Sequence, residues 1–340
     1  MRKTGLSRLL MSLTFLMTGL IGSAQVHAAS NQNNGMDFGV SAIRQSNQQS
    51  KHSYFDLLTT TGKREMLPLR LSNPTSRPIQ VKLKAVDATT NSKGQIQYTG
   101  INTYHPAQNL RFTDLVLSYP KVVTIPKKSD LKVNLTAQMP KKTLSNTILG
   151  GIQVTQVSPS SNKLNQPDEG FTVKNTYAYL IGTKFNFIGN KKTSTDFSIG
   201  HIKLAKVNYR KRLIVPINND NHNIIHKSQI RVNIKKASHD HQLVSQEHLK
   251  DASFAPLSTL PFNLDAQNIG SGRYDAFIRI TQQGHTINLH KKFTITKENA
   301  KAANKGIVHD TQVNWPLIIS VISLALLTLA TILIKLYKMR

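Results

Sequence analysis

Apolar and polar residues alternate with period two at several places in the chain. The clearest examples are 79–85 (IQVKLKA), 131–137 (LKVNLTA), 230–235 (IRVNIK) and, less strictly, 276–280 (AFIRI). Successive side chains of a β-strand point to opposite faces, so such segments bury one face and expose the other. Turn-forming residues lie between them, as at 72–74 (SNP), 91–94 (NSKG), 218–221 (NNDN) and 270–272 (GSG). The pattern predicts that the body of the chain is all-β and consists of two tandem Ig-like β-sandwich domains.

The first 28 residues are typical of a secretory signal peptide. Arg2, Lys3 and Arg8 precede a short uncharged segment, 9–21, that is rich in Leu, Met and Phe. The small residues around His27 then form a cleavage site, and we expect cleavage after Ala28. The apolar segment is shorter than the ~20 residues that span a bilayer, which favours a cleaved signal over an N-terminal anchor.

A second apolar segment, 317–334, contains 18 residues without a charge. A helix of that length is roughly 27 Å long and can cross the hydrocarbon core. Trp315 and Tyr337 flank it, where aromatic rings favour the membrane interface. The three residues Lys335, Lys338 and Arg340 follow it without an acid, so the positive-inside rule places this tail in the cytoplasm. The sequence therefore predicts one C-terminal transmembrane helix and an extracellular body.

The exterior body is strongly cationic. The whole chain has 44 basic and 17 acidic residues and no cysteine. Signal and tail together contain six of the basic residues and no acid, so the body retains 38 against 17, a net charge of +21. Such a surface attracts polyanions, and the attraction is screened within about 10 Å at physiological salt. The absence of cysteine excludes disulfides, thiolate metal sites and cysteine nucleophiles.

Known catalytic motifs are missing from the sequence. There is no G-x-S-x-G, H-E-x-x-H, P-loop or Gly-rich dinucleotide turn. One group of metal-ligating residue types, 239–241 (HDH) with Glu247 and His248, has no zinc-enzyme spacing, and we predict no metal, no cofactor and no catalytic residue. Nucleic acid is not an expected partner, because the body lies outside the cell. The sequence predicts a hairpin turn at 89–94 (TTNSKG) and a short helix over 297–304. For Gly150 and Gly151 we favour a bulge or a positive φ inside a strand; the alternative is that they let a ligand approach the backbone closely.

The order of several short motifs resembles the WxL-interacting protein family of Gram-positive bacteria. In the first half these are 54–57 (YFDL), 70–74 (RLSNP), 88–94 (ATTNSKG), 109–112 (NLRF), 139–140 (MP) and 148–152 (ILGGI). In the second half they are 255–256 (AP), Phe262, 272–274 (GRY), 292–297 (KFTITK) and Ala300. The resemblance covers nearly the whole chain and implies an N-terminal peptidoglycan-binding domain and a C-terminal domain that binds host extracellular matrix. It also implies WxL-domain surface proteins as partners.

Together these observations predict the following organisation: a signal peptide (1–28), a peptidoglycan-binding-like domain (29–189), a host-binding-like domain (190–300), a juxtamembrane spacer (301–314), a transmembrane helix (315–334) and a basic cytoplasmic tail (335–340). The expected function is that of a non-enzymatic, membrane-anchored adaptor that binds peptidoglycan or an anionic wall polymer. Two alternatives stay open: an extracellular strand-donating chaperone, and a hydrolase of wall polymer. The hydrolase would need two close, buried carboxyl groups in a cleft.

Candidate binding residues come from one aromatic segment and from basic pairs in the first domain. The aromatic segment can present a ring to sugars and an acid to amines, and the basic pairs can neutralise wall phosphates or carboxylates. The candidates are Tyr54, Phe55, Asp56, Lys63, Arg64, Lys127, Lys128, Lys141 and Lys142. For 54–57 the alternative is a strand with Phe55 and Leu57 pointing inward.

Overall fold

The computed structural model of the 340-residue chain describes residues 37–99, 110–142, 147–157, 178–188, 196–238, 242–305 and 315–338. The predicted signal peptide, the predicted domain boundary near residue 189 and positions 306–314 of the predicted spacer lie outside these residues, as does the 239–241 histidine segment. The described residues from Phe38 onward fall into one compact unit.

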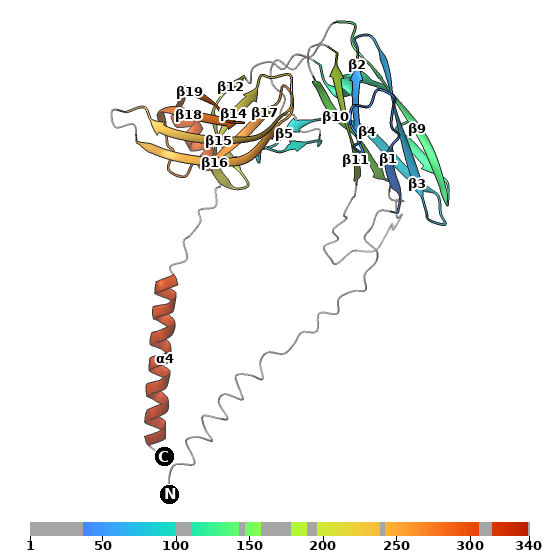
Figure 1. Ribbon diagram of the computed structural model, residues 1–340. Coiled ribbons are helices and arrows are strands. Elements are labelled where there is room, and N and C mark those ends of the chain that lie inside the picture. The colour runs from blue at the N-terminus through green and yellow to red at the C-terminus, as the bar shows by residue number, and fades with distance from the viewer. Residues whose placement is uncertain are drawn as a thin grey trace. The chain divides into compact units, whose positions relative to one another are not determined.

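The first sandwich contains two sheets (Figure 1). One has the order β1 (Gly39–Ala42), β3 (Arg64–Asn73), β9 (Ser129–Gln138) and β7 (Val116–Ser118). The other has the order β2 (Phe55–Thr59), β11 (Ala178–Phe187), β10 (Thr147–Gln156), β4 (Ile79–Asp87) and β8 (Val122–Ile125). Strand β2 pairs with β11 in parallel, and the other described pairs of these sheets are antiparallel.

The core of the first sandwich follows the predicted alternation. In β4 the residues Ile79, Val81 and Leu83 are buried, and the residues between them are exposed. In β9 Val133, Leu135 and Ala137 are buried, whereas Asn134 is exposed and Thr136 is half-buried. Burial of these apolar faces against each other is what holds two sheets together as a sandwich.

The second sandwich also has two sheets. One has the order β16 (Leu243–Phe254), β15 (Ile225–Lys236), β18 (Gly272–Gln282) and β19 (His285–Ile295). In the other, β14 (Arg210–Asn219) pairs along one edge with β12 (Phe197–Ile199) and β13 (Lys203–Val207) and along the other edge with β17 (Thr259–Asp265). One apolar cluster fills the space between the sheets, with Leu213, Val232, Phe254, Phe262 and Ile278 among its buried members. The predicted fold class, two tandem Ig-like sandwiches with a C-terminal apolar helix, is confirmed.

Two short helices and one short hairpin accompany the two sandwiches. Helix α2 (Phe112–Leu115) packs in the first sandwich, and the hairpin of β5 (Thr89–Thr90) and β6 (Ile96–Gln97) confirms the predicted turn chemistry. Asn91 makes this turn, because its Oδ1 accepts hydrogen bonds from the backbone N–H groups of Lys93 and Gln95. Helix α3 (Lys297–Asn304) occupies the residues predicted for it and is capped by Thr296, whose side chain accepts a hydrogen bond from the Asn299 N–H.

Helix α4 (Trp315–Lys338) contains 24 residues. The part from Ile319 to Lys338 is long and apolar enough to cross a membrane. Basic residues Lys335 and Lys338 lie in its last turn, where the helix dipole favours positive charge.

Candidate functional site

The predicted aromatic segment divides between the surface and the core. Tyr54 is 37% exposed and precedes β2, whereas Phe55 is fully buried and Asp56 is almost so. Asp56 accepts a hydrogen bond from Asn186 Nδ2 at 2.8 Å and forms an ion pair with Lys184 Nζ at 3.5 Å. Of the three residues, only Tyr54 is therefore presented to solvent; Phe55 fills the core, and Asp56 links β2 to β11.

The predicted basic pairs lie at two ends of the strand pair β3–β9. Arg64 is opposite Gln138 in the register, and the Met139 N–H bonds to the Lys63 carbonyl, so Lys63 and Arg64 lie at the same end as Lys141 and Lys142. At the other end, Asn73 is opposite Ser129, just after the exposed turn of Lys127 and Lys128. Ten strand residues separate the two ends, about 30 Å. The four cations of the first end can act together, but the 127–128 pair cannot join them on one small ligand.

One of these cations is already engaged. Lys63 Nζ lies 2.9 Å from Oε1 of Glu65, a buried carboxylate that also accepts hydrogen bonds from Thr59 and Asn47. Lys63 therefore compensates a buried charge in part, and Arg64 is left as the more available cation of this doublet.

Tyr54 belongs to a small aromatic cluster on the outer face of the β10–β11 pair. Its ring stacks on His52 with the centroids 5.1 Å apart and the planes 8° from parallel. Gly182 lies opposite Gly151 in the register, and a Cβ on Gly182 would be 3.6 Å from Tyr54 Cβ and 4.0 Å from the Tyr98 hydroxyl. The two glycines thus leave the space in which Tyr54 and Tyr98 lie against the sheet. Burial and, to a smaller extent, the neighbouring Tyr54 raise the pKa of Tyr98.

A groove of about 370 Å³ adjoins this cluster. Its lining includes Arg44, Gln48, Lys51, His52 and Tyr54. Two hydrogen bonds shape the loop: Arg44 Nη2 donates to the Lys51 carbonyl at 3.2 Å, and Gln48 Nε2 donates to the Tyr54 carbonyl at 2.8 Å. The oxygen of the same amide, Gln48 Oε1, is buried and has no hydrogen-bond partner among the described residues. The site combines a flat ring and two cations, which is a set that can bind a sugar carrying a carboxylate.

Sequence reasoning found Tyr54 but missed Arg44, Lys51, His52 and Tyr98. Tyr98 is 44 positions away along the chain, after the β5–β6 hairpin, and only the fold brings it near Tyr54. The sequence held no signal for this cluster, because the pairing of Gly151 with Gly182, which leaves room for the two rings, is set by the strand register.

Gly150 has a structural role, but not the predicted one: β10 pairs with β4 and β11 without a bulge, and neither Gly150 nor Gly151 has a positive φ. A Cβ at this position would clash with Phe112 Cγ, so the Phe112 ring of α2 packs directly on the glycine backbone. The Phe112 ring in turn stacks on Phe185 with the centroids 5.9 Å apart. Gly150 therefore positions α2 on β10, and Gly151 on the opposite face contributes to the aromatic cluster.

The β5–β6 hairpin of the first sandwich contacts the second. The Ser253 N–H donates to the Gly94 carbonyl at 2.7 Å, and the Ala255 N–H donates to Thr90 Oγ1 at 3.0 Å. Ser258 Oγ donates to the Ala255 carbonyl, so the buried 2.6 Å contact between Thr90 and Ser258 uses the Thr90 hydroxyl as donor. These buried hydrogen bonds fix the hairpin on the β16–β17 connection.

Comparison with known proteins supports a two-domain assignment. Residues 38–156 match the profile described as WxL Interacting Protein, peptidoglycan binding domain, and residues 168–305 match WxL Interacting Protein, host binding domain. A search of curated protein sequences finds no relative.

Similar solved structures include three that contain fimbrial-type chaperones. The CupB2 chaperone of Pseudomonas aeruginosa is 12% identical, with a TM-score of 0.27; the match covers 71% of this chain and 98% of the CupB2 chain. A Salmonella enterica SafA pilin complex with the SafB chaperone is 12% identical, with a TM-score of 0.29 and coverages of 77% and 97%. The E. coli chaperone DraB is 11% identical, with a TM-score of 0.28 and coverages of 76% and 95%. Scores this low support no functional argument.

The two profiles together span most of the chain, from residue 38 to residue 305, and they follow each other in the order of the two sandwiches. The chain belongs to the WxL-interacting protein family.

Proposed function

We propose that this protein is a non-enzymatic surface adaptor that is exported by its N-terminal segment and anchored by α4. In this proposal both sandwiches lie outside the cell and the basic tail lies in the cytoplasm. Three features support this topology: the signal-like first 28 residues, the apolar helix with its cationic last turn, and the match to a peptidoglycan-binding domain.

The first sandwich binds peptidoglycan in this proposal, and the aromatic groove beside Tyr54 is its contact site. Peptidoglycan offers sugar rings, whose C–H faces pack on aromatic rings, and peptide carboxylates, which pair with cations. Tyr54 and His52 provide a stacked aromatic surface, and Arg44 and Lys51 provide charge within the same groove. This coincidence of ring and cation is the observation that carries the proposal.

The use of the buried carboxylates favours binding over hydrolysis. Asp56 bonds to Asn186, Glu65 to Thr59, Asp87 to the backbone and hydroxyl of Thr113, and Asp275 to His290. Each of these four acids thus links two parts of its own sandwich. A glycosidase needs two carboxyl groups about 5–10 Å apart that face a common cleft. The matched profiles, moreover, are both named as binding domains.

Capture of a WxL-domain protein is proposed to use strand addition at β19. This strand pairs with β18 over eleven consecutive residues without a register shift, and no described strand pairs with its other edge. The opposite edge strand, β16, has three register shifts in its pairing with β15, and such irregularities discourage further pairing. Strand addition relies on backbone hydrogen bonds, which a long regular edge supplies.

Wall binding is tested with the detergent-solubilised full-length chain and purified insoluble peptidoglycan. We expect Tyr54→Ala to lower the fraction retained about fivefold, the scale of one lost ring contact. The control is Tyr209→Ala, which removes a tyrosine that is 67% exposed on the second sandwich. Retention of the wild type should also fall as salt rises.

Two results would reject the groove as the wall site. One is equal retention of the Tyr54→Ala variant and the wild type. The other is an equal loss in both tyrosine variants, which would indicate a general effect of exposed rings. No retention of the wild type at low salt would reject wall binding altogether.

A further inference from the structure

The outer face of the sheet β16–β15–β18–β19 carries an ordered set of polar and aromatic side chains. Alternate residues of β15 and β18, such as Val232, Ile234, Ala276 and Ile278, are buried in the core. The residues between them therefore face outward. This face lies on the second sandwich and shares no residue with the groove beside Tyr54.

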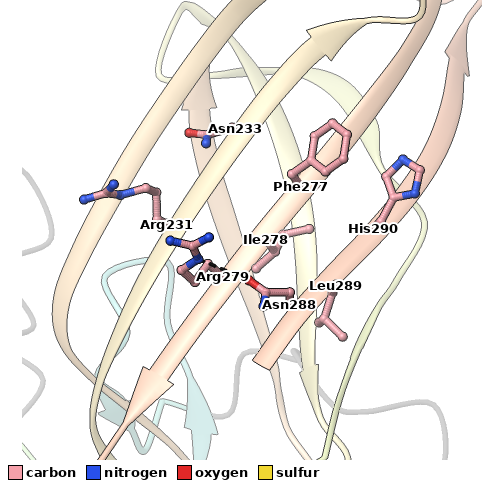
Figure 2. Close-up of a pocket in the computed structure, with 8 residues that line it drawn as sticks. All are labelled: Arg231, Asn233, Phe277, Ile278, Arg279, Asn288, Leu289 and His290. Carbon is pink, nitrogen blue, oxygen red and sulfur yellow. Dashed lines mark hydrogen bonds between the residues drawn. The ribbon is translucent and has the colours of Figure 1, made fainter. Parts of the chain in front are cut away.

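The register aligns the outward residues in two neighbouring rows. The first row contains Arg231 of β15 opposite Arg279 of β18, which is opposite Asn288 of β19. The second row contains Asn233 opposite Phe277, which is opposite His290. These six residues line a groove of about 260 Å³, which we call the Arg–Phe groove (Figure 2).

Two guanidinium groups form the cationic part of the groove. Arg279 Nε donates to Asn288 Oδ1 at 3.1 Å, and this hydrogen bond fixes its orientation. Neither Arg231 nor Arg279 forms an ion pair with a carboxylate of the described residues. Of the acids on the neighbouring strands, Asp275 is buried and bonds to His290 Nε2 at 2.6 Å, and Glu247 of β16 is exposed and lies opposite Val232, one position from Arg231. Both guanidinium groups therefore remain available to an anionic ligand.

An aromatic surface lies next to these cations. Phe277 is 38% exposed and stacks on His290 with the centroids 4.6 Å apart and the planes 11° from parallel. Lys235 Nζ lies 5.6 Å from the centre of the Phe277 ring and adds a third cation at this edge. In Figure 2 the Phe277 and His290 side chains lie together on β18 and β19, beside the Arg279–Asn288 pair.

One polar atom at the groove lacks a partner. Asn233 Oδ1 is buried, and no described residue donates a hydrogen bond to it. Buried acceptors of this kind are normally satisfied, so an unsatisfied one at a groove indicates a missing donor.

We propose that the Arg–Phe groove binds an anionic oligosaccharide, that is, a sugar chain carrying carboxylate or sulfate groups. Arg231 and Arg279 bind the anionic group, the Phe277–His290 surface contacts the face of the sugar ring, and Asn233 accepts a hydrogen bond from a sugar hydroxyl. The proposal gives a ligand class to the host-binding role of the second domain, and it rests on that role.

The same features fit a sugar better than an acidic peptide. The groove is bordered by the amides of Asn233 and Asn288 and has one exposed aromatic side chain, Phe277, whereas an extended peptide is typically bound along a strand edge with pockets for its side chains. An anionic sugar also presents a charge and a flat C–H face within one ring, which matches the short distance between Arg279 and Phe277, two residues apart on one strand face.

The test titrates the full-length chain in detergent micelles with three hexasaccharides of equal length. A heparin-derived hexasaccharide carries sulfate and carboxylate, a hyaluronan hexasaccharide carries carboxylate alone, and maltohexaose is neutral. Hexaglutamate is the peptide probe. Affinities are measured by calorimetry for the wild type, for Phe277→Ala, and for the doubles Arg231→Gln/Arg279→Gln and Lys203→Gln/Lys301→Gln. The second double removes the same charge at exposed positions outside the groove.

We expect at least one anionic hexasaccharide to bind the wild type, and maltohexaose to bind far more weakly. The arginine double should lose about tenfold or more in affinity, and Phe277→Ala should also bind more weakly. The lysine double should bind like the wild type. Binding of the heparin-derived probe alone would assign sulfate as the anionic group, and comparable binding of hyaluronan would assign carboxylate. Circular dichroism of each variant confirms that the fold is kept.

Three results would overturn the proposal: no binding of either anionic hexasaccharide, equal losses in the two doubles, or tighter binding of hexaglutamate that depends on the two arginines. Binding of immobilised host matrix is measured with the same variants. If the wild type fails on matrix but binds a free hexasaccharide, the host-binding role fails and the ligand class stands. If the wild type and the arginine double bind matrix equally well, the host-binding role stands and the Arg–Phe groove is not its site.

Discussion

Alanine substitutions at two glycines with left-handed backbone conformations distinguish the cost of backbone strain from the cost of a steric clash. Gly62 has φ +75° and a Cβ there would meet no atom within 4 Å, whereas Gly94 has φ +67° and a Cβ would lie 2.8 Å from both Leu249 and Ala252. Alanine in a left-handed conformation costs about 1–2 kcal/mol at either position. Only at Gly94 does the added methyl group also push against the second sandwich.

We therefore expect Gly94→Ala to loosen the hairpin from β16 and Gly62→Ala to leave it in place. The readout is hydrogen exchange at the Ser253 and Ala255 amides, which both donate to the hairpin. Exchange at these two amides should be about tenfold faster in Gly94→Ala than in Gly62→Ala, which corresponds to about 1.4 kcal/mol. Equal exchange in the two variants would show that the hairpin contact does not depend on close packing at Gly94.

At the scale of elements, the four strands predicted from alternation, β4, β9, β15 and β18, each bury one face. The alternation at 79–85 and 230–235 lies within β4 and β15, and the Ala- and Lys-rich segment 297–304 forms α3. Pairing order was not predictable, because neighbours such as β2 and β11 are more than 120 positions apart in the chain. The grooves were missed for the same reason: Tyr98 reaches Tyr54, and His290 reaches Phe277, only through strand pairing.

Sequence reasoning also misjudged which polar residues are available. Asp56 looked like a surface ligand because it follows an aromatic residue, yet β2 is buried on both faces and uses this carboxylate to bond Asn186 and Lys184. Alternation cannot reveal such a strand, since both of its faces are covered.

The free edge of β19 is tested with single prolines. Successive backbone N–H groups of a strand point to opposite edges of that strand. Thr286→Pro and Ile287→Pro therefore differ in effect: one removes an N–H donor from the free edge, and the other removes an N–H donor from the pairing with β18. The variant that loses only the free-edge donor should keep its fold by circular dichroism and lose most of its capture of a WxL-domain protein. Ser41→Pro on β1, an edge strand of the first sandwich, is the control. Unchanged capture by both folded β19 variants would rule out strand addition at this edge.

At the scale of the whole molecule, charge and topology support the same interpretation. The exterior retains 38 basic against 17 acidic residues after the six basic residues of the two ends are set aside. A wall polymer or an anionic glycan supplies the counter-charge only if both sandwiches are exported. Wall binding beside Tyr54 and glycan binding at the Arg–Phe groove therefore depend on one claim, that the body of the chain lies outside the membrane.

Cysteine labelling in intact cells tests that claim most directly, because the chain has no cysteine of its own. Single cysteines are introduced at Ser76 in the first sandwich, Ser271 in the second and Lys338 at the end of α4, all exposed positions. With a small membrane-impermeant maleimide, Ser76→Cys and Ser271→Cys should react in intact cells, and Lys338→Cys should react only after the membrane is permeabilised. Labelling of Lys338→Cys from outside, or protection of the two sandwich cysteines until permeabilisation, would contradict the account.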